Sequence, residues 1–413
     1  MKLDPLRESW MTAPETRAVL DALTTGSGEA RFVGGAVRNA LLQRPVTDVD
    51  IATPLPPGDV TRRLEAAGLG AIPTGIEHGT VTAISNGKPF EITTLRRDVA
   101  TDGRRATVAF TTGWKEDAAR RDFTINALYA TRDGEVFDYF GGIRDLEAGR
   151  IRFIGDPVTR IREDYLRILR LFRFHAWYGR GNIDAAALQA AVAEKSGVAK
   201  LSGERLRTEL LKLLQAENPT PAIRVMAASG ILGEFLSDPF DVQRLERLVD
   251  IDCANIFPTD ALLRLAALLP NEPDTAEMVA ERLKMSNADR ERMRGLLTPN
   301  ERIAPHLSIR DARKLLYRLG QQQFRDRLRL RWAEDPETSN TVRWLALLAT
   351  ADAWQRPVFP LSGRDVIEAG IVKGPLVGRI LSELEEWWID SDFAEDALSL
   401  AERLKAMVQA TSY

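Results

Sequence analysis

Hydrophobic and polar residues alternate along short stretches in the first third of the chain, and glycine, proline and asparagine separate these stretches. Alternation with a period of two residues is typical of strands that bury one face. Between the strands, apolar residues three and four positions apart predict helices at 57–68 and 115–130. The predicted strands are 30–35, 48–53, 78–85, 89–96 and 134–140.

The pattern changes beyond about residue 155, where long segments rich in Leu, Ala, Arg and Glu carry apolar residues at helical spacing. Such segments predict helices throughout. Stretches with proline at 216–222, 271–274 and 297–306 are predicted joints between helices. The expected fold class is therefore α+β, with a mixed αβ head followed by an all-α neck, body and tail.

A chain of 413 residues exceeds what one hydrophobic core usually supports, so several domains are expected. With 44% hydrophobic and 28% charged residues, and no apolar run near the roughly 18 residues of a membrane span, we expect a soluble protein with no membrane partner. The predicted domains are a helical lead-in at 1–28, a head at 29–145, a neck at 146–220, a body at 221–300 and a tail at 301–413.

The cysteine content and the N-terminal sequence indicate the cellular compartment in which the protein is expected. Cys253 is the single cysteine, so neither an intramolecular disulfide nor a cysteine zinc cluster is expected. The N-terminus has acidic residues and lacks an apolar signal segment. We therefore expect the protein in the cytoplasm. The sequence carries no signal for its oligomeric state.

Histidine spacing and charge distribution narrow the chemistry further. His78, His175 and His306 are too scattered to form a metal motif, so carboxylates must hold any catalytic metal. The net charge of −3 does not by itself indicate a nucleic-acid partner, but residues 281–331 carry 14 Lys and Arg against 6 Asp and Glu, a local +8. That segment is a candidate surface for RNA phosphates, although arginine-rich helices are often only solvated faces.

Two aspartates stand one residue apart at Asp48 and Asp50. In a strand, side chains at i and i+2 point to the same face, so the two carboxylates are expected to converge and repel unless a cation lies between them. Mg²⁺ is commonly held by one or two carboxylates together with substrate phosphates, and paired metals can clamp an in-line phosphoryl displacement. Alone, such a pair is more often an exposed strand end with solvated acids.

A double glycine, Gly34 and Gly35, precedes this pair and opens a helix-like segment that contains Arg38. Glycines let the backbone turn tightly, and the free N–H groups at a helix start favour anions such as phosphate. An anion site followed by a metal-binding pair suggests a triphosphate delivered to Mg²⁺.

The order of the motifs resembles that of the class II tRNA nucleotidyltransferases, the CCA-adding enzymes, and of their relatives, the bacterial poly(A) polymerases. The resemblance covers about residues 30–180, and the motif sequences look most like those of the mitochondrial and eukaryotic CCA-adding enzymes. Beyond it the helical remainder fits the family in general character. The motifs are "GGAVRNALLQRPVTDVDIAT", "PTGIEHGTVT", "EITTLRRDVATDGRRATVAF", "RRDFTINALY" and "IREDYLRILRLFRF".

The resemblance implies a head built on a polymerase-β-like sheet with helices and a two-metal Mg²⁺ site. Asp48 and Asp50 would hold the metals. Glu91, on a neighbouring predicted strand, is our candidate for a third catalytic acid; the alternative is a strand residue that faces solvent. The residues implied to contact the nucleotide are Gly34, Gly35 and Arg38, with Arg121 on the triphosphate, Asp122 at the ribose, and Asn126.

A further helix is predicted over 156–179, with Asp156 as its N-cap. It is apolar on nearly every side, which is typical of a buried helix. Charged residues nevertheless recur at every third position, and buried charges need partners. A salt-bridged neck helix is one explanation, and a nucleotide site is the other. These residues are Asp164, Arg167, Arg170 and Arg173.

Asp164 and Arg167 together offer a means of choosing the base. Cytosine and adenine each present an amino donor beside a ring-nitrogen acceptor, whereas uracil and guanine present a carbonyl beside an N–H. A fixed carboxylate beside a guanidinium pairs with the first two and mismatches the others. This agrees with the resemblance, which implies an amino-acid template for CTP and then ATP. Arg170 and Arg173 would support the nucleotide or the template geometry.

Residues 96–110 are charged and contain glycine, and we predict a mobile loop there. The resemblance links such a loop to the switch from C to A addition. The implied reaction is attack of the 3′-hydroxyl of a tRNA lacking its 3′ end on the α-phosphate of CTP or ATP, with release of pyrophosphate.

Two rival functions remain open. A poly(A) polymerase would share the head, but such enzymes tend to carry a basic C-terminal extension and residues 381–403 are acidic here. A non-catalytic RNA-binding scaffold is the second rival. The intact set of charged candidates argues against it: Asp48, Asp50, Arg121, Asp164 and Arg167.

Overall fold

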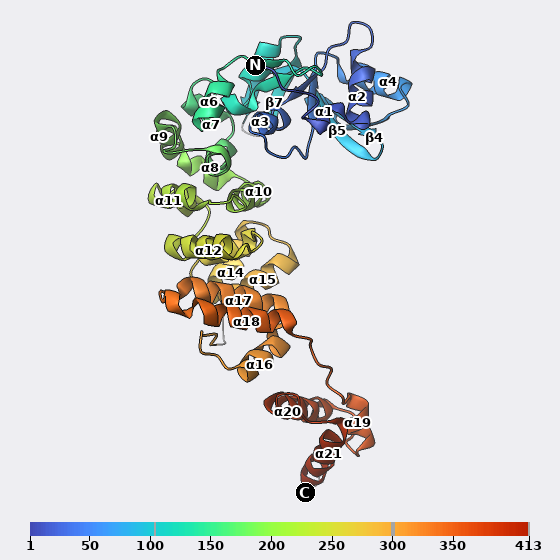
Figure 1. Ribbon diagram of the computed structural model, residues 1–413, viewed down its shortest axis with the longest axis vertical. Helices are drawn as coiled ribbons and strands as arrows, with labels where there is room; N and C mark the ends of the chain where they lie inside the picture. The colour runs from blue at the N-terminus through green and yellow to red at the C-terminus, as the bar shows by residue number, and fades with distance from the viewer. Residues whose placement is uncertain (103–104, 299–301, 412–413) are drawn as a thin grey trace. The chain divides into compact units, whose positions relative to one another are not determined.

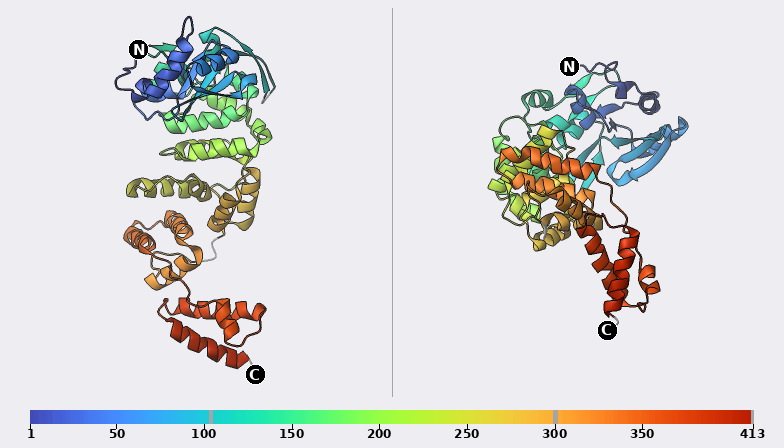
Figure 2. Two further views of the ribbon diagram at one scale, coloured as in Figure 1. Left: turned by 90° about the vertical axis from the view of Figure 1, so that its right-hand side faces the viewer. Right: turned by 60° about the horizontal axis from the view of Figure 1, so that its bottom comes forward.

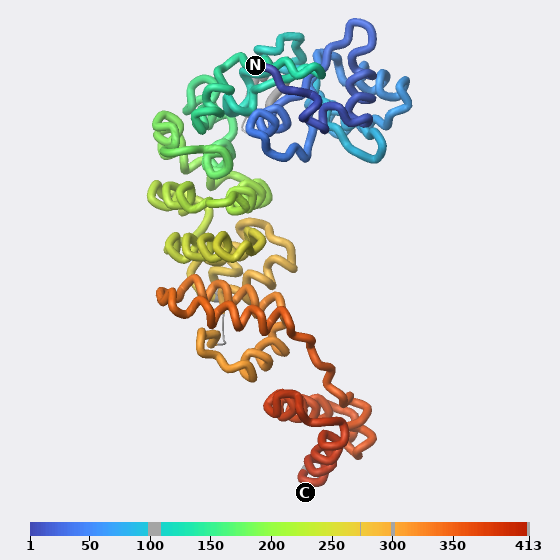
Figure 3. Tube along the Cα trace, in the orientation of Figure 1, coloured from blue at the N-terminus to red at the C-terminus, as the bar shows by residue number. Residues whose placement is uncertain are grey.

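The computed structural model describes residues 1–102, 105–298 and 302–411 of the chain. The chain forms two compact units, which are described separately: Met1–Ser237 with Arg282–Lys284, and Asp238–Glu281 with Met285–Tyr413. Figure 3 follows the chain trace through both units. The division at 237–238 falls inside the predicted body, and the predicted domain bounds stay a prediction.

A seven-stranded sheet forms the centre of the first unit (Figure 1). Its order is β3-β4-β5-β2-β1-β8-β9, with β2 and β5 parallel and the other neighbouring pairs antiparallel. The strands are β1 (Arg31–Val33), β2 (Asp50–Thr53), β3 (Gly70–Gly75), β4 (Thr80–Ser85), β5 (Lys88–Thr94), β8 (Leu128–Ala130) and β9 (Val136–Asp138).

All five predicted strands are confirmed, as β1, β2, β4, β5 and β9. The helix predicted at 57–68 is also confirmed, as α4 (Pro57–Ala66), which packs with α2 (Pro14–Thr24) on the β3–β4 side of the sheet. The strands β3 and β8 were not predicted.

The helix predicted at 115–130 is wrong in its second half. α5 (Trp114–Ala119) ends early, and the chain continues through the 3-10 turn η2 (Thr124–Asn126) into β8. All three residues of β8 are buried, so both faces of the strand are covered. A strand buried on both faces loses the alternation that distinguishes it from a helix.

The segment predicted as a mobile loop forms a β-hairpin instead. β6 (Arg96–Asp102) pairs with β7 (Arg105–Phe110) in a separate two-stranded sheet, with Asp102 opposite Arg105. Residues 103–104 lie outside the described residues.

The remaining helices of the first unit cover the sheet or extend beyond it as the neck. α3 packs against β1 and β8, and α8 packs against α10 and α11. These helices are α1 (Ser9–Thr12), α3 (Gly35–Leu41), α6 (Gly142–Ala148), α7 (Pro157–Glu163), α8 (Leu166–Tyr178), α9 (Ala185–Ala193), α10 (Gly203–Leu214) and α11 (Thr220–Ala228).

The described part of the second unit is helical, as predicted, and each predicted joint contains a helix boundary. Within the described ranges, no helix combines the length and apolar character of a membrane span. The helices are α12 (Val242–Asn255), α13 (Ala261–Leu268), α14 (Pro273–Arg282), α15 (Asn287–Leu297), α16 (Ile309–Leu319), α17 (Gln321–Glu334), α18 (Thr341–Ala353), α19 (Gly363–Glu368), α20 (Pro375–Asp390) and α21 (Ala397–Thr411).

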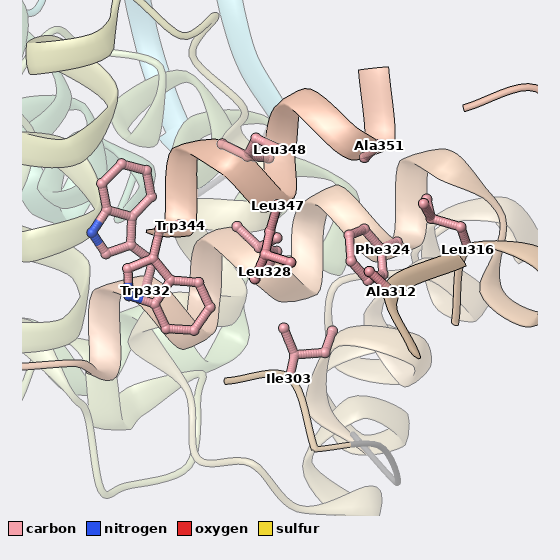
Figure 4. Packing of buried hydrophobic residues seen from close by; sticks show 10 residues of the cluster. All are labelled: Ile303, Ala312, Leu316, Phe324, Leu328, Trp332, Trp344, Leu347, Leu348 and Ala351. Atoms are coloured by element: carbon pink, nitrogen blue, oxygen red, sulfur yellow. The ribbon is translucent and has the colours of Figure 1, made fainter. Parts of the chain in front are cut away.

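Helices α16, α17 and α18 pack against one another and bury a continuous apolar core (Figures 1, 2 and 4). Close packing of this kind makes each buried side chain contribute to stability. The core residues are Ile303, Ala312, Leu316, Phe324, Leu328, Trp332, Trp344, Leu347, Leu348 and Ala351.

Truncation at the centre of this core should destabilise the second unit. Phe324 has no exposed surface, so Phe324→Ala removes its buried contacts and leaves a cavity. We expect a loss of about 3–5 kcal/mol in the free energy of unfolding, measured by urea denaturation. Val342→Ala on α18 is the control, because Val342 is 75% exposed and its loss should change little. Equal midpoints for the two variants would contradict the assignment of this core.

Candidate active site

A polar cavity of about 470 Å³ lies in the first unit, between the sheet and the neck helices. Its lining includes six arginines and three aspartates, a charge balance that suits an anionic ligand. Ten of the thirteen predicted site residues line it; Asp48, Glu91 and Arg173 do not. The lining is Gly34, Gly35, Arg38, Asp50, Arg120, Arg121, Asp122, Asn126, Asp164, Leu166, Arg167, Arg170, Phe174 and Arg205.

The acidic side of the site is built on the parallel strands β2 and β5. Asp50 is the first residue of β2, and the register places Glu91 of β5 directly opposite it. Asp48 precedes the strand, where Thr47 Oγ1 donates a hydrogen bond of 3.1 Å to its carboxylate. Strand pairing begins only at Asp50, so Asp48 lies just before β2. Asp48 and Asp50 are both exposed and Val49 between them is buried, as expected for two side chains on one face.

These carboxylates nevertheless affect one another. Desolvation and the neighbouring Glu91 carboxylate raise the pKa of Asp50 to about 6, with Asp48 adding to the rise and Arg121 opposing it. An aspartate whose charge is disfavoured in this way is a good ligand for a cation that relieves the repulsion.

The donor chemistry fits a hard divalent ion. Carboxylate oxygens are the ligands that Mg²⁺ prefers, and Mg²⁺ usually completes its shell with water and substrate phosphates. Among the described residues no cluster of three or more His, Cys, Asp or Glu forms a full protein cage. Asp48 and Asp50 could therefore hold such an ion only together with a ligand such as a phosphate.

The glycine turn leads from β1 into α3. Gly34 has φ 69° and ψ −118°, a conformation that a residue with a Cβ adopts only under strain. Arg38, on α3, is buried and donates to Asn126 Oδ1 at 2.5 Å and to the Tyr178 hydroxyl at 2.8 Å. Its guanidinium also lies over the Tyr178 ring, 4.1 Å from the centroid. Burial lowers the pKa of Arg38.

Asp122 links the head to the neck. Its carboxylate accepts hydrogen bonds from Phe123 N at 2.8 Å, Asn126 Nδ2 at 3.1 Å and Arg170 Nε at 2.7 Å. Burial alone would raise its pKa, but Arg170 and the other donors outweigh burial and lower the pKa to about 2. Asp122 therefore stays charged, and it fixes Arg170 of α8 beside the head.

The helix predicted over 156–179 is broken in two. Asp156 caps α7 as predicted, accepting from Thr159 N at 2.8 Å. The helix then stops at Asp164, which is extended with φ −158° and accepts a hydrogen bond from Leu166 N at 3.1 Å. Aspartate side chains that bond the backbone two residues on compete with helix formation. Asp164 therefore does not belong to the helical row of Arg167, Arg170 and Arg173.

Asp164 and Arg167 both line the cavity, but each is held by a different partner. Arg167 Nη1 contacts Glu163 Oε2 at 2.5 Å and the Arg160 carbonyl at 2.7 Å. Arg205 Nη2 contacts Asp164 Oδ2 at 2.7 Å. Both members of the predicted base-reading pair thus border the same cavity, each held by a partner of its own.

Of the other two arginines predicted on this helix, Arg170 lines the cavity and Arg173 does not. Arg170 lines it and pairs with Asp122. Arg173 lies outside it and pairs with Glu209 of α10, with Nε and Oε2 2.8 Å apart. Arg173 thus supports α8 from behind, in agreement with one of its two predicted roles.

Two cavity arginines were missed, Arg120 and Arg205. Arg120 directly precedes Arg121, so the doubled arginine of "RRDFTINALY" could have revealed it. Arg205 lies on α10, 41 positions beyond Asp164, and no spacing in the sequence connects the two.

The basic segment 281–331 is largely neutralised within the second unit. Arg329 is buried and pairs with Asp252, and Arg292 pairs with Asp326 at 2.7 Å. On α16, basic residues pair with the acidic stretch that includes the end of α20. Many basic side chains in the described part of this segment therefore have acidic partners within the fold, and its role as a surface for RNA phosphates stays a prediction. The pairs on α16 are Arg313–Asp392, Lys314–Asp390 and Arg318–Glu386.

Comparison with known proteins gives a consistent result. Residues 30–152 match the poly A polymerase head domain, and residues 182–240 match a probable RNA- and SrmB-binding site of polymerase A. The mitochondrial CCA tRNA nucleotidyltransferase 1 of Danio rerio is 35% identical over 88% of this chain and 84% of its own length. The CCA-adding enzyme of Latilactobacillus sakei is 31% identical over 90% of this chain and 92% of its own.

The fold comparison agrees. The crystal structure of the Bacillus stearothermophilus CCA-adding enzyme in complex with CTP superposes with a TM-score of 0.77 at 26% identity, covering 96% of this chain and 98% of that one. The expected fold class, a nucleotidyltransferase head followed by an all-α remainder, is confirmed. The chain therefore belongs to the family of CCA-adding tRNA nucleotidyltransferases.

Proposed function

We propose that this protein adds or repairs the 3′-terminal CCA of tRNA by template-independent transfer of CMP and AMP from CTP and ATP, releasing pyrophosphate. The observation that carries the proposal is the single cavity that joins Asp50 and the triphosphate-side arginines to Asp164 and Arg167. The names of the relatives, CCA tRNA nucleotidyltransferase and CCA-adding enzyme, support the same activity.

The rivals are less well supported. A poly(A) polymerase needs to accept one base only, and the relatives reported above are CCA-adding enzymes. A scaffold without activity gives no reason for a charge-strained Asp50 opposite Glu91.

We assign the reacting end of the cavity to the carboxylates. Mg²⁺ bound by Asp48 and Asp50, with Glu91 as the proposed third acid, would activate the RNA 3′-hydroxyl and neutralise charge at the α-phosphate. Arg121, beside Asp50, is proposed to bind the triphosphate, and Gly34 and Gly35 to let it approach the backbone closely.

We assign the far end of the cavity to sugar and base. Asp122 is proposed to accept the ribose 2′-hydroxyl, in a position that Asn126 and Arg170 fix. Asp164 and Arg167 would face the base edge, and because separate partners hold them, both are pre-oriented before the nucleotide arrives. We place the protein in the cytoplasm, since its single cysteine suits a reducing compartment.

The activity can be tested directly. The purified protein is given tRNA lacking its 3′ end, Mg²⁺ and each labelled nucleoside triphosphate, and the product is sized. We expect two C and one A to be added, because the cavity accepts an amino donor beside a ring acceptor. Long A tracts would favour the polymerase, and no incorporation would favour the scaffold.

The charge strain at Asp50 predicts a pH-dependent effect of its removal. The folded protein keeps a proton on Asp50 up to a pKa of about 6, against an ordinary value of 3.8. The contribution of Asp50 to the free energy of unfolding is therefore fully present below about pH 4, and it is lost as the pH rises through about 6. Asp50→Asn should abolish incorporation, yet in metal-free buffer it should gain stability relative to the wild type between pH 4 and pH 7.

Thermal unfolding at the two pH values measures this difference, with Asp133→Asn, an exposed site away from the cavity, as control. Full activity of Asp50→Asn would remove Asp50 from the reaction. If Asp50→Asn and the wild type differ in stability by the same amount at pH 4 and at pH 7, the raised pKa of Asp50 is contradicted.

Base choice should depend on Asp164, Arg167 and, through Asp164, on Arg205. Asp164→Ala should admit UTP and GTP, because the mismatched carboxylate is gone; we expect the ratio of kcat/KM for CTP over UTP to fall by at least about tenfold. Arg205→Ala should lower the same ratio less strongly, since it leaves the Asp164 carboxylate in place and removes the partner that orients it. Arg162→Ala, which breaks an exposed pair with Glu194, is the control. Unchanged ratios in Asp164→Ala and Arg167→Ala would refute the template assignment.

A further inference from the structure

A buried carboxylate that does not line the cavity stands behind its arginines. Asp117, on α5, is 1% exposed. Its Oδ1 accepts from Arg120 Nε at 2.8 Å and from Arg96 N at 3.2 Å. Its Oδ2 accepts from the Tyr129 hydroxyl at 2.7 Å and from Arg121 Nη2 at 3.2 Å. One side chain thus joins four different residues.

Those four residues belong to separate parts of the head. Arg96 is the first residue of β6, so its amide lies at the base of the hairpin. Arg120 and Arg121 line the cavity, and Tyr129 is the middle residue of β8, the strand next to the edge strand β9. Asp117 therefore connects the base of the hairpin directly with two cavity arginines.

The helix that carries Asp117 is itself firmly attached. Trp114, at the start of α5, packs edge-on against Tyr129 with ring centroids 5.4 Å apart. The Arg31 guanidinium lies over the Trp114 ring at 4.1 Å. Because α5 is held to the sheet in this way, Asp117 is a fixed point relative to which the hairpin and the arginines are placed.

The charges favour this arrangement. Burial alone would raise the pKa of Asp117, but Arg121 and Arg120 outweigh it and the pKa is lowered. Burial and the Asp117 charge raise the pKa of Tyr129, although Arg121 opposes this, so its hydroxyl stays protonated and can donate. Charge-assisted hydrogen bonds of this type are the stronger ones and restrict the geometry of their partners.

We propose that Asp117 is a positioning residue that sets Arg120 and Arg121 for the triphosphate and ties their placement to the base of the β6–β7 hairpin. The amide of Arg96 and Nε of Arg120 donate to the same atom, Asp117 Oδ1, so a displacement of the hairpin at Arg96 changes the position of the acceptor that orients Arg120. The hairpin can thus bias phosphate binding without touching the nucleotide. The proposal rests on the proposed function, because it needs a triphosphate in the cavity.

The test is Asp117→Asn, an isosteric change. An asparagine offers one acceptor oxygen, and its N–H₂ group faces the arginine donors that the carboxylate had accepted. We expect KM for both CTP and ATP to rise about tenfold with a smaller change in kcat, because the lost positioning affects binding of the triphosphate. Hydrogen exchange at the Arg96 amide should accelerate in the same variant.

Two further variants separate positioning from general destabilisation. Asp145→Asn removes another buried carboxylate of the head, one that accepts from Thr124 Oγ1 at 2.7 Å and Arg152 Nε at 2.9 Å, and it should lower stability without the rise in KM. Tyr129→Phe removes one donor to Asp117 and one acceptor of Arg121 but keeps both arginine–carboxylate pairs, so its rise in KM should be smaller than that of Asp117→Asn. A similar rise in KM in Asp145→Asn would point to a structural effect.

Failure of the inference and failure of the function give different results. Wild-type protein that adds CCA, together with unchanged KM values and unchanged Arg96 exchange in Asp117→Asn, would overturn the positioning role alone. Wild-type protein that incorporates no nucleotide would overturn the proposed function first.

Discussion

Mutual repulsion among six arginines in one cavity is the constraint on which the rest of the site depends. Guanidinium groups this close destabilise the fold unless carboxylates compensate them, and the compensating groups must not fill the space that the ligand needs. The protein solves this with acids placed behind or beside the cavity. Asp117 holds Arg120 and Arg121, Glu163 holds Arg167, and Asp122 holds Arg170.

The same ion pairs assemble the catalytic head and the neck into one site. Asp122 comes from the turn before β8, whereas Arg170 comes from α8, and their contact fixes one element against the other. Arg38 on α3 does the same through the Tyr178 hydroxyl at the end of α8. At the opposite end, Asp50 and Glu91 repel one another, Arg121 offsets this repulsion only in part, and a cation can relieve the rest. Under the proposed function, the arginines are oriented before a triphosphate binds, and the carboxylates await a metal ion.

Much of the site was predictable because its motifs are local. The strand ending at Val33, the glycine turn and Asp50 lie within 20 residues, and propensity and turn chemistry specify them. The placement of Glu91 opposite Asp50 followed from the expectation of neighbouring strands. The break at Asp164 was not predicted, because a side-chain bond to Leu166 N overrides an apolar pattern that continues on both sides. β8 was read as helix because its burial on both faces removed the alternation.

The sequence by itself determined the fold class, the acids at Asp48 and Asp50, and most of the charged residues that line the cavity. Only the tertiary structure decided their partners: Arg205 for Asp164, Asp117 for the doubled arginine, and the acids of α20 for the basic face of α16. The physical reason is that residue type and spacing encode local geometry, whereas the pairing of charges depends on which distant elements meet. Burial then makes each such pairing obligatory.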